Sequence, residues 1–154
     1  MKKIKIYLLV GVIFVILTGC SNGFAQKEYN AIDKIVGTED RYAKVGSVFN
    51  PIDNGYLLKA AKFDGRETLW TKTLVNNKYI EIKIKLRLSE GTAKLVHIDE
   101  DGNVSTIIEC TQDNASDEYI LKTISLKKGL NRIRIVGYGC KNIDVELLSS
   151  EFEQ

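Results

Sequence analysis

One ten-residue stretch, Tyr79–Leu88, constrains the fold of this chain more than any other. Its aliphatic residues occupy every second position and alternate with a tyrosine or a charged residue. Because successive side chains of a β-strand point to opposite faces of a sheet, this alternation predicts a strand with one apolar and one charged face. A register shift of one residue would turn the apolar face to water, so the pairing is well defined. The stretch therefore predicts a sheet that covers a hydrophobic core.

Turn signals divide the rest of the chain into short segments. Runs rich in Gly, Asn or Asp recur at intervals of about 8–12 residues, which is typical of an antiparallel sandwich or barrel. We therefore predict an all-β fold, a single antiparallel β-sandwich of roughly seven to nine strands. The first part of the domain is less regular, with a short helix or a first strand over residues 28–36. Further strands are predicted near Val45–Phe49 and over 93–98, 104–110, 119–126, 131–138 and 143–148.

The N-terminus has the pattern of an export signal. Lys2, Lys3 and Lys5 precede a run without charge from Ile6 to Leu17. A helix of this length spans about 18 Å, whereas a bilayer core is about 30 Å thick and needs about 20 apolar residues. The run is therefore too short for a stable span and suits the apolar region of a signal peptide.

The run ends in Leu17-Thr18-Gly19-Cys20, which resembles the lipobox of bacterial lipoproteins. The resemblance implies that residues 1–19 are a lipoprotein signal peptide, cleaved after a diacylglyceryl group is attached to the Cys20 thiol. Two or more acyl chains anchor firmly where a single one holds only marginally. The expected location is the extracytoplasmic face of a cell membrane, with membrane lipid as partner. An ordinary signal peptide and an uncleaved anchor are the alternatives.

Cleavage changes the charge balance of the chain. It would remove three of the 22 basic residues and none of the 20 acidic ones, which leaves the product close to neutral. The total charge therefore gives no reason to expect nucleic acid or an anionic surface as partner. Residues 20–28 are small and polar and are predicted to form a lipidated tether. Residues 29–154 are long enough for one β-sandwich domain with its own core.

The second half of the domain carries a family resemblance. The stretches LSEGTAKLVHIDEDG (88–102) and LKKGLNRIRIVGYGCKNIDVELL (126–148) are similar to the closing strands of jelly-roll carbohydrate-binding modules. This resemblance implies a jelly-roll sandwich and, less directly, a carbohydrate ligand. The acidic opening strand common in such modules is missing from the first half. The matching positions are Gly129, Asn131, Ile133, Ile135, Asn142, Ile143 and Asp144.

Aromatic residues are candidates for a sugar-stacking surface. Trp70, Tyr79 and Tyr138 lie in or beside predicted strands, at positions that could face outward. Sugar rings stack on aromatic faces, and neighbouring amides hydrogen-bond their hydroxyls. The jelly-roll resemblance places Asn142 and Tyr138 beside the loops where such modules often bind. The alternative for Trp70 is a place in the core.

Other chemistry-bearing residues have a structural alternative. His97 lies near Asp99 and Asp101 but lacks a nucleophile motif, so a strand histidine is the simpler interpretation. Asp99, Asp101 and Asn103 resemble the start of a calcium loop but lack the later Glu, which favours a hairpin turn. No metal, cofactor or catalytic residue is predicted. Basic residues could line one sheet face or merely be solvated there: Lys83, Lys85, Arg87, Arg132 and Arg134.

Two cysteines remain once Cys20 is assigned to lipid. Cys110 ends one predicted strand and Cys140 follows another, so a disulfide between them is an expectation in an extracytoplasmic compartment. Two free thiols are the alternative.

The sequence thus favours a membrane-anchored, non-catalytic binding domain. The expected ligand class is a carbohydrate or another polymer of the cell envelope. The alternative is an interaction or assembly factor that docks another envelope protein on one of its sheet faces.

Overall fold

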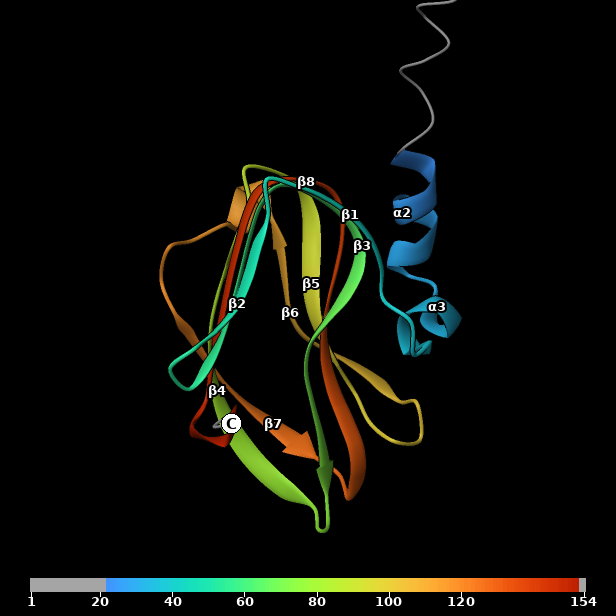
Figure 1. Cartoon of the computed structure of the whole chain (residues 1–154), viewed down its shortest axis with the longest axis vertical. Coiled ribbons are helices and arrows are strands. Elements are labelled where there is room, and N and C mark those ends of the chain that lie inside the picture. Colours follow the sequence, from blue (N-terminus) through green and yellow to red (C-terminus); the bar gives the residue numbers. More distant parts are fainter. Residues whose placement is uncertain (1–21, 153–154) are drawn as a thin grey trace, which may run out of the picture.

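A computed structural model describes residues 22–152 of the chain. The predicted signal peptide, the lipobox and Cys20 lie outside the described residues. Within them, two short helices precede eight strands, and two single 3-10 turns follow the sixth and eighth strands (Figure 1). The all-β prediction is confirmed. The elements are α2 (Asn22–Tyr29), α3 (Ile32–Val36), β1 (Arg41–Val45), β2 (Val48–Ile52), β3 (Gly55–Leu74), β4 (Lys78–Arg87), β5 (Glu90–Ile98), β6 (Val104–Thr111), β7 (Ile120–Leu126), β8 (Gly129–Leu148), η1 (Gln112–Asn114) and η2 (Ser150–Phe152).

The long strands β3 and β8 form the spine of the molecule. Each has 20 residues, and they pair antiparallel from Gly55↔Leu148 to Leu74↔Gly129. Their register shifts once where the ribbon bends, between Phe63 and Gly65 on β3. At this bend the backbone N–H of Gly139 donates a hydrogen bond of 2.6 Å to the Asp64 carboxylate.

Glycine is required on the inner side of this bend. Gly65 has a φ of +107°, and a Cβ there would lie 2.1 Å from the carbonyl oxygen of Arg41. Any side chain would therefore push β1 away from β3. The bend lets each long strand contribute to two sheet layers.

The two layers have jelly-roll connectivity. The front layer consists of β2, residues 55–63 of β3, residues 140–148 of β8, β4 and β7. The back layer consists of residues 65–74 of β3, residues 129–137 of β8, β5 and β6. If each half of β3 and of β8 is counted as one strand and the count starts at β3, the strand order of the front layer is 1-8-3-6. The strand order of the back layer is then 2-7-4-5, and together these are the orders of a double-sheet jelly roll.

The main core lies between the layers. The aliphatic side chains of β4 and of Leu88, which follows it, are buried while the residues between them face outward, as the alternation predicts: Ile80, Ile82, Ile84, Leu86 and Leu88. They pack with the buried side chains of both long strands and of β5. Burial of each such side chain stabilises the fold by roughly 1.5–3 kcal/mol.

Helices α2 and α3 cover the outer side of the back layer, where α2 lies against β8 and β3 and α3 lies against β6. Tyr29 and Ile35 pack there on Val96, Ile98 and Val136 in a second apolar cluster. The prediction of a tether over residues 20–28 is therefore wrong from Asn22 onward. Although this segment is short and polar, Ala25, Glu28 and Tyr29 are spaced so that they lie on one side of a helix, and all three are buried against the sheet. The helical alternative for 28–36 is correct in kind, but the helix is interrupted at Asn30-Ala31.

Strands β1 and β2 follow one another along the same edge of β3. Residues 41–45 pair with residues 66–62, and residues 48–52 continue along residues 59–55. Between them the backbone turns at Gly46, which has a φ of +56°. Pro51 within β2 has no N–H to offer a further strand. This edge is thus interrupted twice.

Strand β8 differs from the prediction of two separate strands over 131–138 and 143–148. The turn signals at Gly139 and Asn142 are real, since both have positive φ (61° and 48°). They bend the strand without ending its pairing, because β3 continues alongside. The described helices include none long and apolar enough to cross a membrane.

Candidate functional site

The outer surface of the front layer, here called the front face, is a polar sheet surface that neither helix covers. It carries the outward residues of β4, which alternate with the core residues: Tyr79, Glu81, Lys83, Lys85 and Arg87. In cross-strand register with them lie Asp144 and Glu146 on β8, and Leu121 on β7. The front face thus combines side chains of β4, β7 and β8 in one surface.

Ion pairs fix the middle of the front face. The Arg87 guanidinium lies 3.0 Å from Asp144, and the Lys59 ammonium lies 3.4 Å from the same carboxylate. Lys85 pairs with Glu146, which also accepts a hydrogen bond from the Tyr119 hydroxyl. These two hydrogen bonds lower the pKa of Glu146 and so keep it ionised. Lys59, Lys85 and Arg87 are therefore each matched by a carboxylate.

The interpretation of a basic sheet face is wrong for this reason, and also because two of its members lie elsewhere. Arg132 and Arg134 belong to the half of β8 in the back layer, where they face the helices. Arg134 is fully buried and donates to the carbonyl oxygens of Ile35 (2.7 Å) and Gly37 (2.6 Å) at the end of α3. Both arginines therefore hold a helix and not a ligand.

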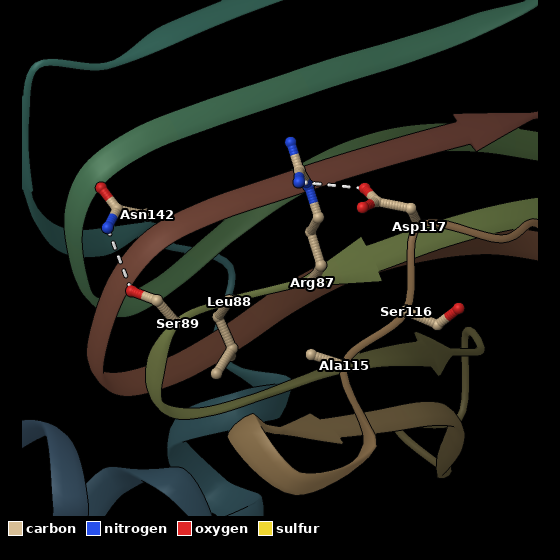
Figure 2. Close-up of a pocket in the computed structure, with 7 residues that line it drawn as sticks. All are labelled: Arg87, Leu88, Ser89, Ala115, Ser116, Asp117 and Asn142. Atoms are coloured by element: carbon tan, nitrogen blue, oxygen red, sulfur yellow. Dashed lines mark hydrogen bonds and ion pairs between the residues drawn. The ribbon is translucent and has the colours of Figure 1, made fainter.

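One hollow, the Asn142 hollow, lies at the end of the front face where β4 leads into β5 (Figure 2). It has a volume of about 300 Å³ and opens to solvent. The Asn142 amide donates a hydrogen bond of 3.0 Å to the Ser89 hydroxyl, and Arg87 lies 2.9 Å from Asp117 across the hollow. The wall therefore presents fixed donors and acceptors. The lining residues are Arg87, Leu88, Ser89, Ala115, Ser116, Asp117 and Asn142.

A second hollow, the Leu121 hollow, lies further along the same face. It measures about 340 Å³ and is open as well. The Ser149 hydroxyl at its base donates to the Glu81 carbonyl at 2.7 Å. Its lining is Asp53, Asn54, Glu81, Lys83, Leu121, Leu148, Ser149 and Ser150.

Two tyrosines stand out from the front face. Tyr79 is 77% exposed and precedes Glu81 on the outward side of β4. The Lys85 ammonium lies 5.3 Å from the centroid of the Tyr119 ring. Tyr119 directly precedes β7 and lies between the two hollows. Tyr119 was not among the predicted site residues. Its place follows from the pairing of β4 with β7, which no local sequence pattern reveals.

The predicted sugar-stacking residues do not share one surface. Trp70 is only 4% exposed and packs in the core against Phe152, with ring centroids 5.1 Å apart. Its predicted role as a ligand platform is therefore wrong. The pairing register of β3 shifts between Thr68 and Trp70, and after this shift the Trp70 side chain points into the core. Tyr138 faces the helices and meets Tyr29 edge-on at 5.2 Å. Tyr79 and Asn142 do lie on the front face.

Those two residues are far apart along it. Tyr79 is eight residue steps along β4 from Arg87 at the Asn142 hollow, and eight steps correspond to about 26 Å of extended strand. A small ligand could not touch both, whereas an extended polymer could.

The residues considered for acid–base or calcium chemistry are structural. The buried His97 ring lies 2.9 Å from the Asn131 side-chain oxygen, and Asn131 in turn closes the turn before β8 through Lys127 and Gly129. Asp99 accepts from the backbone N–H of Asn103 at 2.8 Å, as a hairpin turn requires. Among residues 22–152, no group of three or more possible ligands could hold a metal ion.

Cys110 and Cys140 are both buried as free thiols, which contradicts the predicted disulfide. Cys140 donates instead to the carbonyl oxygen of Thr92 at 3.1 Å. Cys110 lies on β6 opposite Ala93 of β5 in the back layer, whereas Cys140 begins the front-layer half of β8 opposite Phe63. Burial raises the pKa of Cys140 to about 12, which keeps it protonated and unreactive.

Comparison with known proteins gives distant structural likenesses. No protein-family model matches the chain, and no curated protein matches it in sequence. A variant of the family 29 carbohydrate-binding module CBM29-2, complexed with mannohexaose, aligns with a TM-score of 0.44 and 12% identity. That alignment covers 73% of this chain and 79% of the other. A second variant of a family 29 module aligns at 0.43 and 13%, covering 75% and 83%. At these TM-scores the likeness carries no argument about what this chain binds.

Proposed function

We propose that this protein is a lipid-anchored, non-catalytic domain on the extracytoplasmic side of a bacterial membrane, where it binds a carbohydrate polymer of the envelope. The observation that carries the binding proposal is the front face, with its two open hollows and two projecting tyrosines on a rigid sheet. The anchoring part rests on the basic, apolar and Leu17–Cys20 segments in their order.

The anchor has a direct test. Cys20→Ser removes the thiol that would carry the lipid, so the protein should leave the membrane fraction or remain unprocessed. The measurement is fractionation of cells with detection of the mature and precursor forms. Ser21→Ala is the matched control and should remain in the membrane fraction. Retention of a fully processed Cys20→Ser protein in that fraction would contradict lipidation at this residue.

Carbohydrate suits the front face on chemical grounds. Its charges pair with one another, so the surface is polar without a strong excess of either sign. A neutral polymer of hydroxyl groups needs such fixed donors and acceptors, together with aromatic faces for its rings. The separation of about 26 Å between Tyr79 and the Asn142 hollow favours a chain of several sugar units over a single sugar.

Binding can be tested with envelope polysaccharide and a broad glycan array. We expect Tyr79→Ala and Asn142→Ala each to weaken retention about tenfold, because stacking and amide contacts are each worth about 1–2 kcal/mol. Tyr42→Ala, an exposed tyrosine of β1 outside the front face, is the matched control. Blank results from both the array and a cell-wall pull-down would exclude the carbohydrate class.

A second candidate function, docking of an envelope protein, is favoured by β7. In the described part of the chain this strand pairs with β4 alone, and Ile120 and Leu121 are exposed on it. Such an edge can accept an additional strand from a partner. In-cell cross-linking from a photoreactive residue at Lys122 should then yield one defined partner, and a smear or no product would count against this alternative.

A further inference from the structure

Phe24, Arg41 and Tyr42 form a small surface beside the start of α2, here called the entry patch. Phe24 is 37% and Tyr42 is 47% exposed, although both are large aromatic residues. The Arg41 guanidinium lies 3.5 Å from the centroid of the Phe24 ring. The three side chains border a hollow of about 220 Å³, which Ala25, Ala43 and Asp64 complete. Two large aromatic rings and a guanidinium are thus exposed together at this hollow.

The charges of the entry patch leave Arg41 available. Its guanidinium lies 3.3 Å from Glu28, but Glu28 is buried and also pairs with the buried Arg66. One carboxylate thus serves two arginines, and the Arg41 side chain remains 60% exposed. Asp64 in the floor of the hollow is already engaged by the Gly139 backbone N–H. The patch therefore presents the exposed Arg41 guanidinium beside the Phe24 ring, with the Tyr42 ring on the same hollow.

The position of the entry patch along the chain suggests its partner. Helix α2 begins at Asn22, two residues after Cys20. Two residues of chain span at most about 7 Å, and Phe24 follows about 3 Å further along the helix. The headgroup region on each side of a bilayer is about 5–7 Å thick. An acylated Cys20 would therefore hold Phe24 at or just beyond the headgroups.

We propose that the entry patch contacts the headgroup region of the membrane when the protein is anchored. Phe24 and Tyr42 supply the aromatic rings that favour this depth, and Arg41 supplies a hydrogen-bonding partner for lipid phosphate. The inference rests on the proposed lipid anchor at Cys20. It orients the domain, because α2 lies on the back layer while the front face is on the opposite side of the sandwich.

The test places a fluorescent probe in the patch. Phe24→Trp is prepared as the lipidated protein in phosphatidylcholine vesicles that contain lipids brominated close to the headgroup. We expect bromine to quench its emission about twofold, since an aromatic ring at the interface lies near the label. Tyr79→Trp, an exposed position on the front face, is the matched control and should keep its emission. The buried Trp70 contributes the same background to both variants.

The outcomes separate the contact from the anchor. If the lipidated protein is on the vesicles but Phe24→Trp is no more quenched than Tyr79→Trp, the membrane contact is wrong and the anchor stands. If the Cys20→Ser protein is processed and still partitions with membranes, the anchor itself fails. Selective quenching of Phe24→Trp that disappears with Arg41→Glu and Tyr42→Ser together supports the contact, and circular dichroism confirms that this variant is folded.

Discussion

Asp99 illustrates how a buried carboxylate holds a single β-turn in place. Burial alone would raise its pKa, but hydrogen bonds from Lys127 and Asn103 outweigh this and lower the pKa to about 2. The charged form is therefore favoured in the folded state. Lys127 lies 2.7 Å from Asp99, so the carboxylate also joins the turn before β8 to the turn after β5.

We expect Asp99→Asn to lower the free energy of unfolding by roughly 2 kcal/mol at pH 7, the value of a shift of nearly two pKa units. The pKa is depressed on folding, so this stabilisation is complete above about pH 4 and is lost as the pH falls toward 2. Urea unfolding of parent and variant at several pH values measures the difference. Asp101→Asn, which changes an exposed carboxylate 3.8 Å from Lys127, is the control. A difference that persists unchanged at pH 2 would contradict the assignment.

The thiols give a second prediction at this scale. In the Cys20→Ser protein, a thiol reagent should find two free groups after unfolding without reductant and almost none while the protein is folded. Burial and raised pKa values protect Cys110 and Cys140 in the folded state. A count of zero in the unfolded protein would instead show that the cysteines are bridged in solution.

Among the elements, α3 depends on a side chain from another part of the chain. Arg134 contacts the carbonyl oxygens that end this five-residue helix and also lies 2.9 Å from Asp40. A helix of this length is not stable by itself. Cations near the last carbonyls of a helix stabilise it. The helix thus persists because β8 carries an arginine beneath it.

We expect Arg134→Met to lower the free energy of unfolding by about 3 kcal/mol or more, because it leaves buried carbonyls and Asp40 without their donor. Arg134→Lys should recover only part of this, since lysine cannot form the planar fork of contacts. Hydrogen exchange at residues 32–40 should accelerate in both variants. Unchanged protection there in Arg134→Met would show that the helix packs without this residue.

The comparison of sequence with structure is instructive at the level of elements. The strand over 79–88 is predictable because its alternation is long and strict. The continuity of β8 is not, since Gly139 and Asn142 have the chemistry of a turn and it is the neighbouring β3 and β5 that keep the strand paired across the bend. Helix α2 is not evident from the sequence because its buried side includes a small residue, Ala25, and a charged residue, Glu28. Their burial depends on the sheet and on the ion pair of Glu28 with Arg66.

The candidate site is less predictable than the fold for a related reason. Tyr79 and Asn142 can be named from their own strand and turn, and both reach the front face. Tyr119 and Glu146 join them only through the register of β7 and β8 with β4. Trp70 is turned inward by a register shift that local sequence does not encode.

The whole molecule has no boundary at which its two layers could separate. Strands β3 and β8 each run through both layers, and the main core takes side chains from the front and the back. Loss of one layer would therefore break strands of the other. This connectivity predicts a single cooperative unfolding transition.

Trp70 provides a probe for that prediction because it is buried between the layers. Its fluorescence and the far-ultraviolet circular dichroism should change at the same urea concentration. Gly65→Ala should shift both curves together toward lower urea, since the bend serves both layers. Two separate midpoints in the parent protein would show that the layers unfold independently.

The interrupted edge along β1 and β2 also limits self-association. Gly46 and Pro51 break the row of backbone groups that another copy would need, and a bulge at Ile107 of β6 disturbs the edge of the back layer. Strand β7 instead pairs with β4 over its whole length without a break in register, and it contains no proline. Growth into a fibre requires two compatible edges on each molecule. A molecule with one suitable edge can pair it only with the same edge of a second copy, which gives a closed dimer. At high concentration this protein should therefore stop at dimers.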